Sequence, residues 1–149
     1  MTLDRGRLIE LLGGGHEDAA PADFLHVVGR VAVAVRLPGL RHLRAEDAVA
    51  HGLRLAGEGA DLLDVGGEST RPGAARVAED EQIARVVPVV AGLRARGCTL
   101  PISVDTTRAR VAEAALAAGA DLVNDVSGLS DDAALGPLVA RAGVPVVLM

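Results

Sequence analysis

Three polar side chains, Asp64, Asp105 and Asn124, stand at or next to the ends of short apolar runs. A carboxylate accepts hydrogen bonds, and an asparagine amide offers both a donor and an acceptor, which suits the amide-like edge of a heterocycle. Taken singly, Asp105 could equally cap the helix after it, and Asn124 could form a turn with Asp125. Three polar groups at the same end of three strands are harder to explain as caps, and they favour a shared binding site.

The segment Asp64–Gly73 carries groups that suit an anionic substrate. Its three glycines free the backbone for tight turns and for the close approach of a ligand. Ser69 and Thr70 offer hydroxyl donors, and Arg71 offers a fork-shaped cation. The alternative interpretation is a glycine- and proline-rich turn in which a hydroxyl side chain caps the next helix.

Five apolar runs of strand length alternate with helical patterns, as in a parallel α/β sheet with outer helices. In the third run, alternation places Ser103 and Asp105 on one face. Thr106 or Thr107 is predicted to cap the helix that follows. The predicted strands are 31–35, 62–65, 102–105, 122–125 and 144–149, and the predicted helices are 45–56, 79–96, 108–119 and part of 131–142. The residues predicted to face inward on the second helix are Ile83, Val86, Val87, Val90 and Leu93.

The sequence Gly59–Asp64 recurs in similar form as Gly119–Asn124, sixty residues or two βα units further along the chain. In a (β/α)8 barrel, alternate strands contribute side chains to the same interior layer. Asp64 and Asn124 are therefore expected at equivalent inward positions near the mouth. A flavodoxin-like, doubly wound sheet is the alternative fold, and it predicts no such repeat. We expect the N-terminal part of a TIM (β/α)8 barrel with about five strands.

Three motifs resemble the dihydropteroate synthase family over about residues 45–149. Asp64–Gly73 is similar to the second loop of that family, Ser103–Thr107 to its third-strand motif and Val123–Gly128 to its fourth. Members join p-aminobenzoate to 6-hydroxymethyl-7,8-dihydropterin diphosphate on a (β/α)8 scaffold and release diphosphate, a step of folate biosynthesis. The resemblance implies this transferase activity, with a pterin and p-aminobenzoate as small-molecule partners.

The resemblance also implies roles for single residues. Asp105 and Asn124 would hydrogen-bond the pterin ring, Thr70 would belong to the substrate site, and Arg71 would lie in the loop closing over p-aminobenzoate and diphosphate. Asp105 is the candidate catalytic residue, because a nearby carboxylate stabilises the pterin-methyl cation that remains when diphosphate leaves. Asp64 joins the substrate-binding set because it is expected beside them.

The sequence departs from the family pattern in its first loop. The family has an asparagine there that binds magnesium and diphosphate, whereas this chain has Val35. A hydrocarbon side chain offers no oxygen to a hard cation, so we do not expect this position to ligate Mg²⁺, the metal of the family. The sequence supplies no other metal-ligand set.

A second departure is the extent of the barrel. The later pterin- and anion-binding residues of the family have no counterpart, and five strands leave two sheet edges unpaired, which is an aggregation hazard. We therefore expect missing residues, a homodimer or a complementing chain to complete the barrel, and we expect the chain alone to be inactive.

Two alternative functions follow from these departures and from the shared barrel. The first is a non-catalytic half-barrel that keeps the pterin-binding edge without turnover. The second is the pterin domain of a corrinoid methyltransferase, and the run Glu68–Pro72 argues against it.

Composition bounds the class of protein. Half of the 149 residues are apolar, which suits one domain made of βα units from 30 to 149 after an N-terminal extension at 1–29. A net charge of −5 with no basic run argues against a nucleic-acid partner, and no apolar run is long enough to span a membrane. The single cysteine, Cys98, excludes an internal disulfide and fits the reducing cytoplasm. The absence of lysine excludes a Schiff base.

Overall fold

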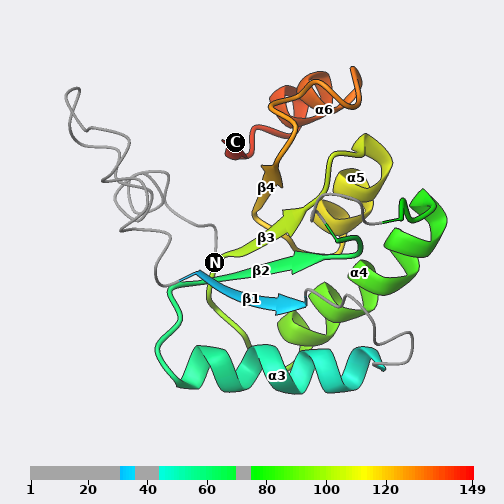
Figure 1. Ribbon diagram of the computed structural model, residues 1–149. Helices are drawn as coiled ribbons and strands as arrows, with labels where there is room; N and C mark the ends of the chain where they lie inside the picture. The colour runs from blue at the N-terminus through cyan, green and yellow to red at the C-terminus, as the bar shows by residue number, and fades with distance from the viewer. Residues whose placement is uncertain (1–30, 36–43, 70–74) are drawn as a thin grey trace.

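The computed structural model describes residues 31–35, 44–69 and 75–149 (Figure 1). Its strands are β1 (Val31–Val35), β2 (Leu62–Gly66), β3 (Ile102–Asp105), β4 (Leu122–Asp125) and β5 (Val146–Leu148). Its helices are α3 (Ala45–Gly57), α4 (Glu79–Ala95), α5 (Ala109–Ala117) and α6 (Leu135–Ala142). The extension predicted at 1–29 lies outside the described residues.

The order of the strands decides between the two predicted folds. The sheet runs β1-β2-β3-β4-β5, so each strand lies beside its neighbour along the chain, and every pair is parallel. A doubly wound sheet reverses its strand order at a switch point, whereas a (β/α)8 barrel keeps strands in chain order. The four described helices lie along one side of the curved sheet (Figure 1). The prediction of an α/β fold that forms the N-terminal part of a TIM barrel is confirmed.

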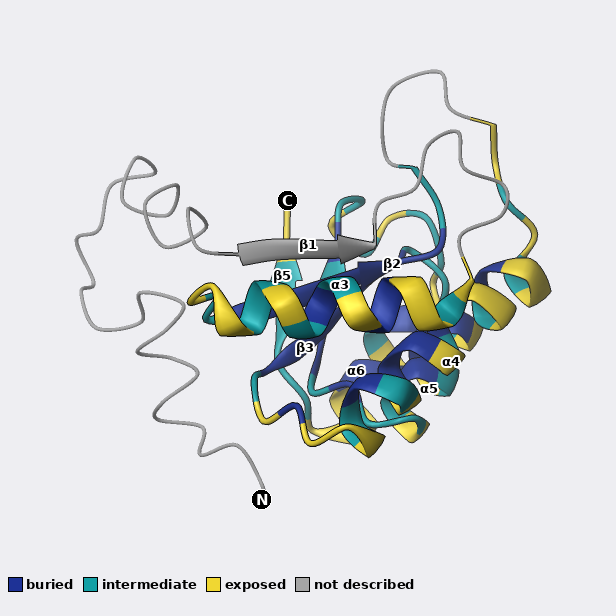
Figure 2. Ribbon diagram, turned by 90° about the horizontal axis from the view of Figure 1, so that it is seen from below, coloured by how far each residue is buried: buried dark blue, intermediate teal, exposed yellow. Residues whose placement is uncertain are grey.

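The hydrophobic core lies between the sheet and these helices. Leu63, Val65, Ile102 and Val104 of the central strands are fully buried and pack in one cluster with apolar residues of the helices. Each such side chain contributes about 1.5–3 kcal/mol when it leaves water. Figure 2 shows β2 and β3 as buried, while α3 carries exposed residues on its outer side.

Helix α4 packs against α3 at a glycine. A Cβ atom built at Gly92 would lie 2.7 Å from Cγ2 of Val49 in α3, closer than real side chains come. A glycine therefore lets the two helices approach at this point.

The buried face of α4 differs from the prediction. Ile83 and Val87 are only half-buried, whereas Gln82 and Val89 are buried, because Gln82 is drawn inward by hydrogen bonds described below.

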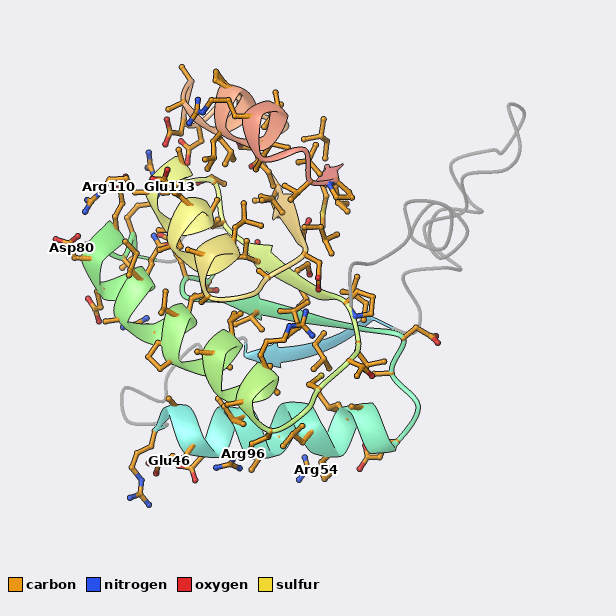
Figure 3. The ribbon with its side chains drawn as sticks, turned by 180° about the vertical axis from the view of Figure 1, so that it is seen from behind. Glu46, Arg54, Asp80, Arg96, Arg110 and Glu113 are labelled. Atoms are coloured by element: carbon orange, nitrogen blue, oxygen red, sulfur yellow. The ribbon has the colours of Figure 1, made fainter. Side chains whose placement is uncertain are left out.

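Arginine side chains join the helices at both ends of α4. Near its C-terminus, the guanidinium of Arg94 donates to the carbonyl oxygens of Gly119, Cys98 and Leu100 at 2.8–2.9 Å and also pairs with Asp121. This arrangement holds the turns that precede β3 and β4. Near the N-terminus of α4, Arg110 of α5 pairs with Glu79 at 3.1 Å and with Asp80 at 3.0 Å; Figure 3 labels Arg110 and Asp80.

Candidate functional site

Strands β2, β3 and β4 place polar side chains on the face of the sheet that lies opposite the helices. Val104 and Val123 belong to the core on the helix side, so Asp105 and Asn124, which follow them, point to the other face. Asp64 lies between two core residues of β2 and points the same way. Asp64 and Asp105 are 4% and 5% exposed, and Asn124 is half-buried. The structure therefore brings these three predicted residues to one face.

Hydrogen bonds connect the polar residues of the three strands. Oδ1 of Asp64 accepts from the hydroxyl of Ser103, and Oδ2 accepts from Nδ2 of Asn124 at 3.4 Å. Asp105 is the register partner of Asn124 on the neighbouring strand. Ser103 and Asp105 share one face, as the alternation predicted, and Asp64 and Asn124 share that face, as the repeat predicted.

Gly66, the last residue of β2, leaves room for the Asp105 carboxylate. The two residues are register partners, and a Cβ atom built at Gly66 would lie 3.2 Å from Cβ and 3.4 Å from Oδ2 of Asp105. A side chain at position 66 would push against the carboxylate. The glycine is therefore part of how the sequence positions Asp105.

Thr70 and Arg71, the predicted substrate-binding residues of the loop after β2, lie outside the described residues. Residues on either side of them are held together by Glu68. Its Oε1 accepts from the backbone N–H of Val77 and its Oε2 from Nε2 of Gln82, both at 3.0 Å. The Gln82 amide also donates to the carbonyl oxygen of Val77 at 2.9 Å. These contacts join the two ends of the segment 69–76.

Gly67 allows β2 to end against the first turn of α4. A Cβ atom at this position would lie 3.0 Å from the Cα atom of Gln82, which is backbone that cannot easily move. The carbonyl oxygen of Gly67 accepts from the guanidinium of Arg85 at 2.9 Å. Gly66 and Gly67 are thus both needed because other residues approach them closely, Asp105 at Gly66 and Gln82 at Gly67.

Asp131, in the loop after β4, contacts residues of the loops after β2 and β3. Its carboxylate accepts from the guanidinium of Arg76 at 2.7 and 3.2 Å and from the hydroxyl of Thr107 at 2.7 Å, and Arg108 lies 3.6 Å away. The hydrogen bond from Arg76, and then that from Thr107, lowers the pKa of Asp131 from 3.8 to about 2. The loops after β2, β3 and β4 are therefore braced against each other at the carboxyl end of the sheet.

Asp132 corrects the predicted cap of the helix that begins near 108. Neither Thr106 nor Thr107 occupies the N-cap position, which belongs to Arg108 and has no side-chain cap. The first N–H of α5, that of Ala109, instead donates to Asp132 at 2.8 Å, and this bond lowers the pKa of the Asp132 carboxyl. A carboxylate at a helix N-terminus also suits the helix dipole. The hydroxyl of Thr106 accepts from the Arg108 N–H at 3.1 Å.

Asp125, the neighbour of Asn124, shapes the loop after β4. It is fully buried, and its two carboxylate oxygens accept from the backbone N–H groups of Ser127 at 2.8 Å and Leu129 at 2.6 Å. These bonds hold Leu129 at a φ of 66°, a left-handed conformation that side chains other than glycine rarely adopt. The turn-forming interpretation therefore holds for Asp125, whereas Asn124 faces the site.

Comparison with known proteins identifies the family. The model of the pterin binding enzyme family matches residues 36–149, which is most of the chain. This chain belongs to the pterin-binding enzyme family. Among curated relatives, it is 58% identical over 111 residues to dihydropteroate synthase of Mycobacterium leprae, covering 74% of this chain and 38% of the relative. It is 43% identical over 104 residues to the enzyme of Bacillus subtilis, covering 70% of this chain and 36% of the relative.

Solved structures give the same assignment. Dihydropteroate synthase of Xanthomonas albilineans with 4-aminobenzoic acid is 54% identical with a TM-score of 0.66, and the match covers 74% of this chain and 40% of that one. The Yersinia pestis enzyme with a pterine-sulfa conjugate is 44% identical with a TM-score of 0.66, covering 71% and 40%. The chain thus spans about two fifths of the length of these pterin-binding enzymes.

The described residues of this chain hold no group of three or more His, Cys, Asp or Glu side chains that could hold a metal ion. The side chain of Val35, where the family resemblance expects a magnesium ligand, lies outside the described side chains. The expectation that position 35 does not ligate Mg²⁺ therefore stays a prediction. No helix in the described part of the chain is long and apolar enough to cross a bilayer.

Sequence reasoning missed Arg76 and Asp131 and assigned no partner to Glu68. Arg76 and Asp131 are 55 residues apart in the sequence, so no local spacing links them. The available signal was topological: in a barrel, the βα loops meet at one rim, so opposite charges in different loops of that rim are candidates for pairing. Glu68 belonged to a recognised motif, but its partners Val77 and Gln82 became visible only once α4 was placed against β2.

Proposed function

We propose that the chain binds a pterin on the polar face of β2, β3 and β4 and works as part of a dihydropteroate synthase site. The reaction condenses 6-hydroxymethyl-7,8-dihydropterin diphosphate with p-aminobenzoate to give dihydropteroate and diphosphate. The observation that carries the proposal is the gathering of Asp64, Asp105 and Asn124 on one buried face in a chain of the pterin-binding family. Relatives that are 58% and 43% identical to this chain over their matched parts are named dihydropteroate synthase, which supports a role in folate biosynthesis.

Asp105 is the proposed catalytic residue. When diphosphate leaves, positive charge develops on the pterin methylene carbon, and a fixed carboxylate in a site that excludes water stabilises that charge strongly. Asp105 is 5% exposed at the end of β3, and Gly66 leaves the room that its carboxylate needs. Asn124, its register partner, is proposed to hydrogen-bond the ring of the pterin.

Thr70 and Arg71 remain the residues proposed for p-aminobenzoate and diphosphate. Hydroxyl and guanidinium donors suit a diphosphate, and Arg binds such groups with two parallel hydrogen bonds. The solved Xanthomonas albilineans enzyme contains 4-aminobenzoic acid, which supports an aromatic amine as the second substrate. Any Mg²⁺ would need ligands other than Val35. We place the protein in the cytoplasm, as its single cysteine suggests.

A second candidate function is a non-catalytic, pterin-binding half-barrel that needs a partner or further residues for turnover. Leu148 and Met149, at 47% and 70% exposure, are the large apolar side chains left exposed in the described part of the chain, and they lie at the outer edge of the described sheet. A strand paired with β5, from a second copy, another chain or further residues, would cover them.

Incorporation of radiolabelled p-aminobenzoate separates the two candidates. The full chain is incubated with the dihydropterin diphosphate, and labelled dihydropteroate is measured after chromatography. Labelled product above the level of an Asp105→Ala control supports the synthase. Pterin binding without product supports the half-barrel, and the absence of both rejects the two functions together.

A further inference from the structure

Asp64 uses both carboxylate oxygens on neighbouring strands. Oδ1 accepts from Ser103 on β3 and Oδ2 from Nδ2 of Asn124 on β4, at 3.4 Å. Ser103 is the register partner of Asp64, so the first bond runs directly across two paired strands. Asp64 is 4% and Ser103 is 2% exposed, which keeps water from competing for these bonds. The Asp64 carboxylate is thus engaged by protein groups on the site face.

The chemistry of these groups fixes the direction of the Asn124 amide. A carboxylate only accepts hydrogen bonds, whereas the amide of Asn124 has a donor end and an acceptor end. The donor end must therefore face Asp64, and Oδ1 must point away from it. This Oδ1 atom is buried, and no described residue donates a hydrogen bond to it.

We propose that Asp64, steadied by Ser103, is a positioning residue that presents the carbonyl oxygen of Asn124 to the guest, so that the site selects a heterocycle carrying an amino group at that edge. This inference rests on the proposed pterin binding, and it names the feature of the pterin that the site reads. A ring without the amino group leaves Oδ1 of Asn124 unpaired, and such unpaired buried groups are what make polar sites selective.

Replacing Asp64 by Asn adds a hydrogen-bond donor to this side chain with little change in its shape. The new side chain carries an NH2 group that can donate to Oδ1 of Asn124, so the Asn124 amide can turn over and offer its own NH2 group to the guest. Ser103→Ala is the matched control. It removes one hydrogen bond from the same carboxylate but leaves Asp64 an acceptor, so the direction of the Asn124 amide is preserved.

The test is calorimetric binding of three rings to the full 149-residue chain. The rings are 2-amino-4-oxopteridine, the same ring without the amino group, and the dioxo ring that carries a carbonyl oxygen in its place. We expect the unmodified chain to prefer the amino ring over both others by roughly ten-fold or more, as for one unpaired buried group. Asp64→Asn should reduce both preferences to about three-fold or less, whereas Ser103→Ala should retain them.

Two results would overturn the inference. One is an unmodified chain that binds the amino and dioxo rings equally, because a fixed Asn124 oxygen repels a carbonyl; this measurement needs no variant to fold. The other is an Asp64→Asn chain that folds, as circular dichroism reports, and keeps the full preference. Failure of the proposed function looks different, since the unmodified chain would then bind none of the three rings.

Discussion

Replacing Glu68 by Gln tests whether this residue holds the ends of the segment 69–76 together. Its Oε1 accepts from the Val77 N–H and its Oε2 from Nε2 of Gln82, each at 3.0 Å. A glutamine keeps one acceptor oxygen, but its NH2 group would face the NH2 group of Gln82. With its oxygen on the Val77 N–H, the variant loses the bond that Gln82 donates in its present orientation.

The size of the effect follows from these contacts. A hydrogen bond to a charged group contributes about 1.5–3 kcal/mol. Glu68 is half-buried, and the amide of Gln82 still donates to the Val77 carbonyl oxygen at 2.9 Å, so neither group is left wholly unpaired. We therefore expect Glu68→Gln to lower the free energy of unfolding by about 1.5 kcal/mol, at the lower end of the range.

Urea unfolding followed by far-UV circular dichroism measures this change, because the sequence has no Trp or Tyr for fluorescence. Glu81→Gln is the matched control, since Glu81 is exposed and pairs with Arg85 one helical turn away. It should change stability by only about 0.3–0.5 kcal/mol. A Glu68→Gln chain as stable as the control would refute the reasoning.

A reversed pair sharpens the same test. Gln82→Glu alone sets two carboxylates against each other, so it should be strongly destabilising. Combined with Glu68→Gln, it restores one hydrogen bond with the donor and acceptor exchanged. The double variant should be more stable than the sum of the single changes predicts by about 1 kcal/mol. Simple additivity would show that Glu68 and Gln82 do not interact.

Two further changes probe the loops and the helix layer. The pKa of Asp131 is lowered to about 2 by Arg76 and Thr107, so its contribution to stability is complete above the unfolded value near 4 and is lost as the pH falls from about 4 to about 2. Because Arg76 is largely exposed, we expect Asp131→Asn to be less stable by only about 1 kcal/mol at pH 7, with the difference closing near pH 2 in urea titrations; a difference independent of pH would contradict this. Gly92→Ala should lower stability by about 1–3 kcal/mol, because its Cβ would lie 2.7 Å from Val49, and Val49→Ala in the same chain should recover part of the loss; equal additive losses would argue against the contact.

Much of the fold could be predicted because periodicity is a local signal. The runs at 31–35, 102–105 and 122–125 became strands with the predicted bounds. The repeat of Gly59–Asp64 at Gly119–Asn124 predicted a (β/α)8 fold, because alternate strands of such a barrel contribute to the same interior layer. The strand order of the sheet agrees with this prediction. The shared face of Asp64 and Asn124 followed from this repeat.

Contacts between distant loops could not be predicted in the same way. Asp131 pairs with Arg76 across 55 residues and with Thr107 across 24, and neither separation leaves a periodic trace. The same limit explains the cap of α5, where a local hydroxyl was predicted and Asp132 from the next loop is used. The buried face of α4 was misjudged at Gln82, since a polar residue is drawn inward only once its partner Glu68 is in place.

Binding of a pterin to the full chain and to its Asp105→Ala variant tests the central claim most directly. Calorimetry with 6-hydroxymethyl-7,8-dihydropterin diphosphate should detect binding by the unmodified chain, and loss of the buried carboxylate should weaken it by roughly ten-fold or more. An Asp80→Ala chain, altered at an exposed residue of α4, should bind as the unmodified chain does. No heat of binding at millimolar pterin, or equal affinity in the Asp105→Ala chain, would contradict a pterin site at the ends of β2, β3 and β4.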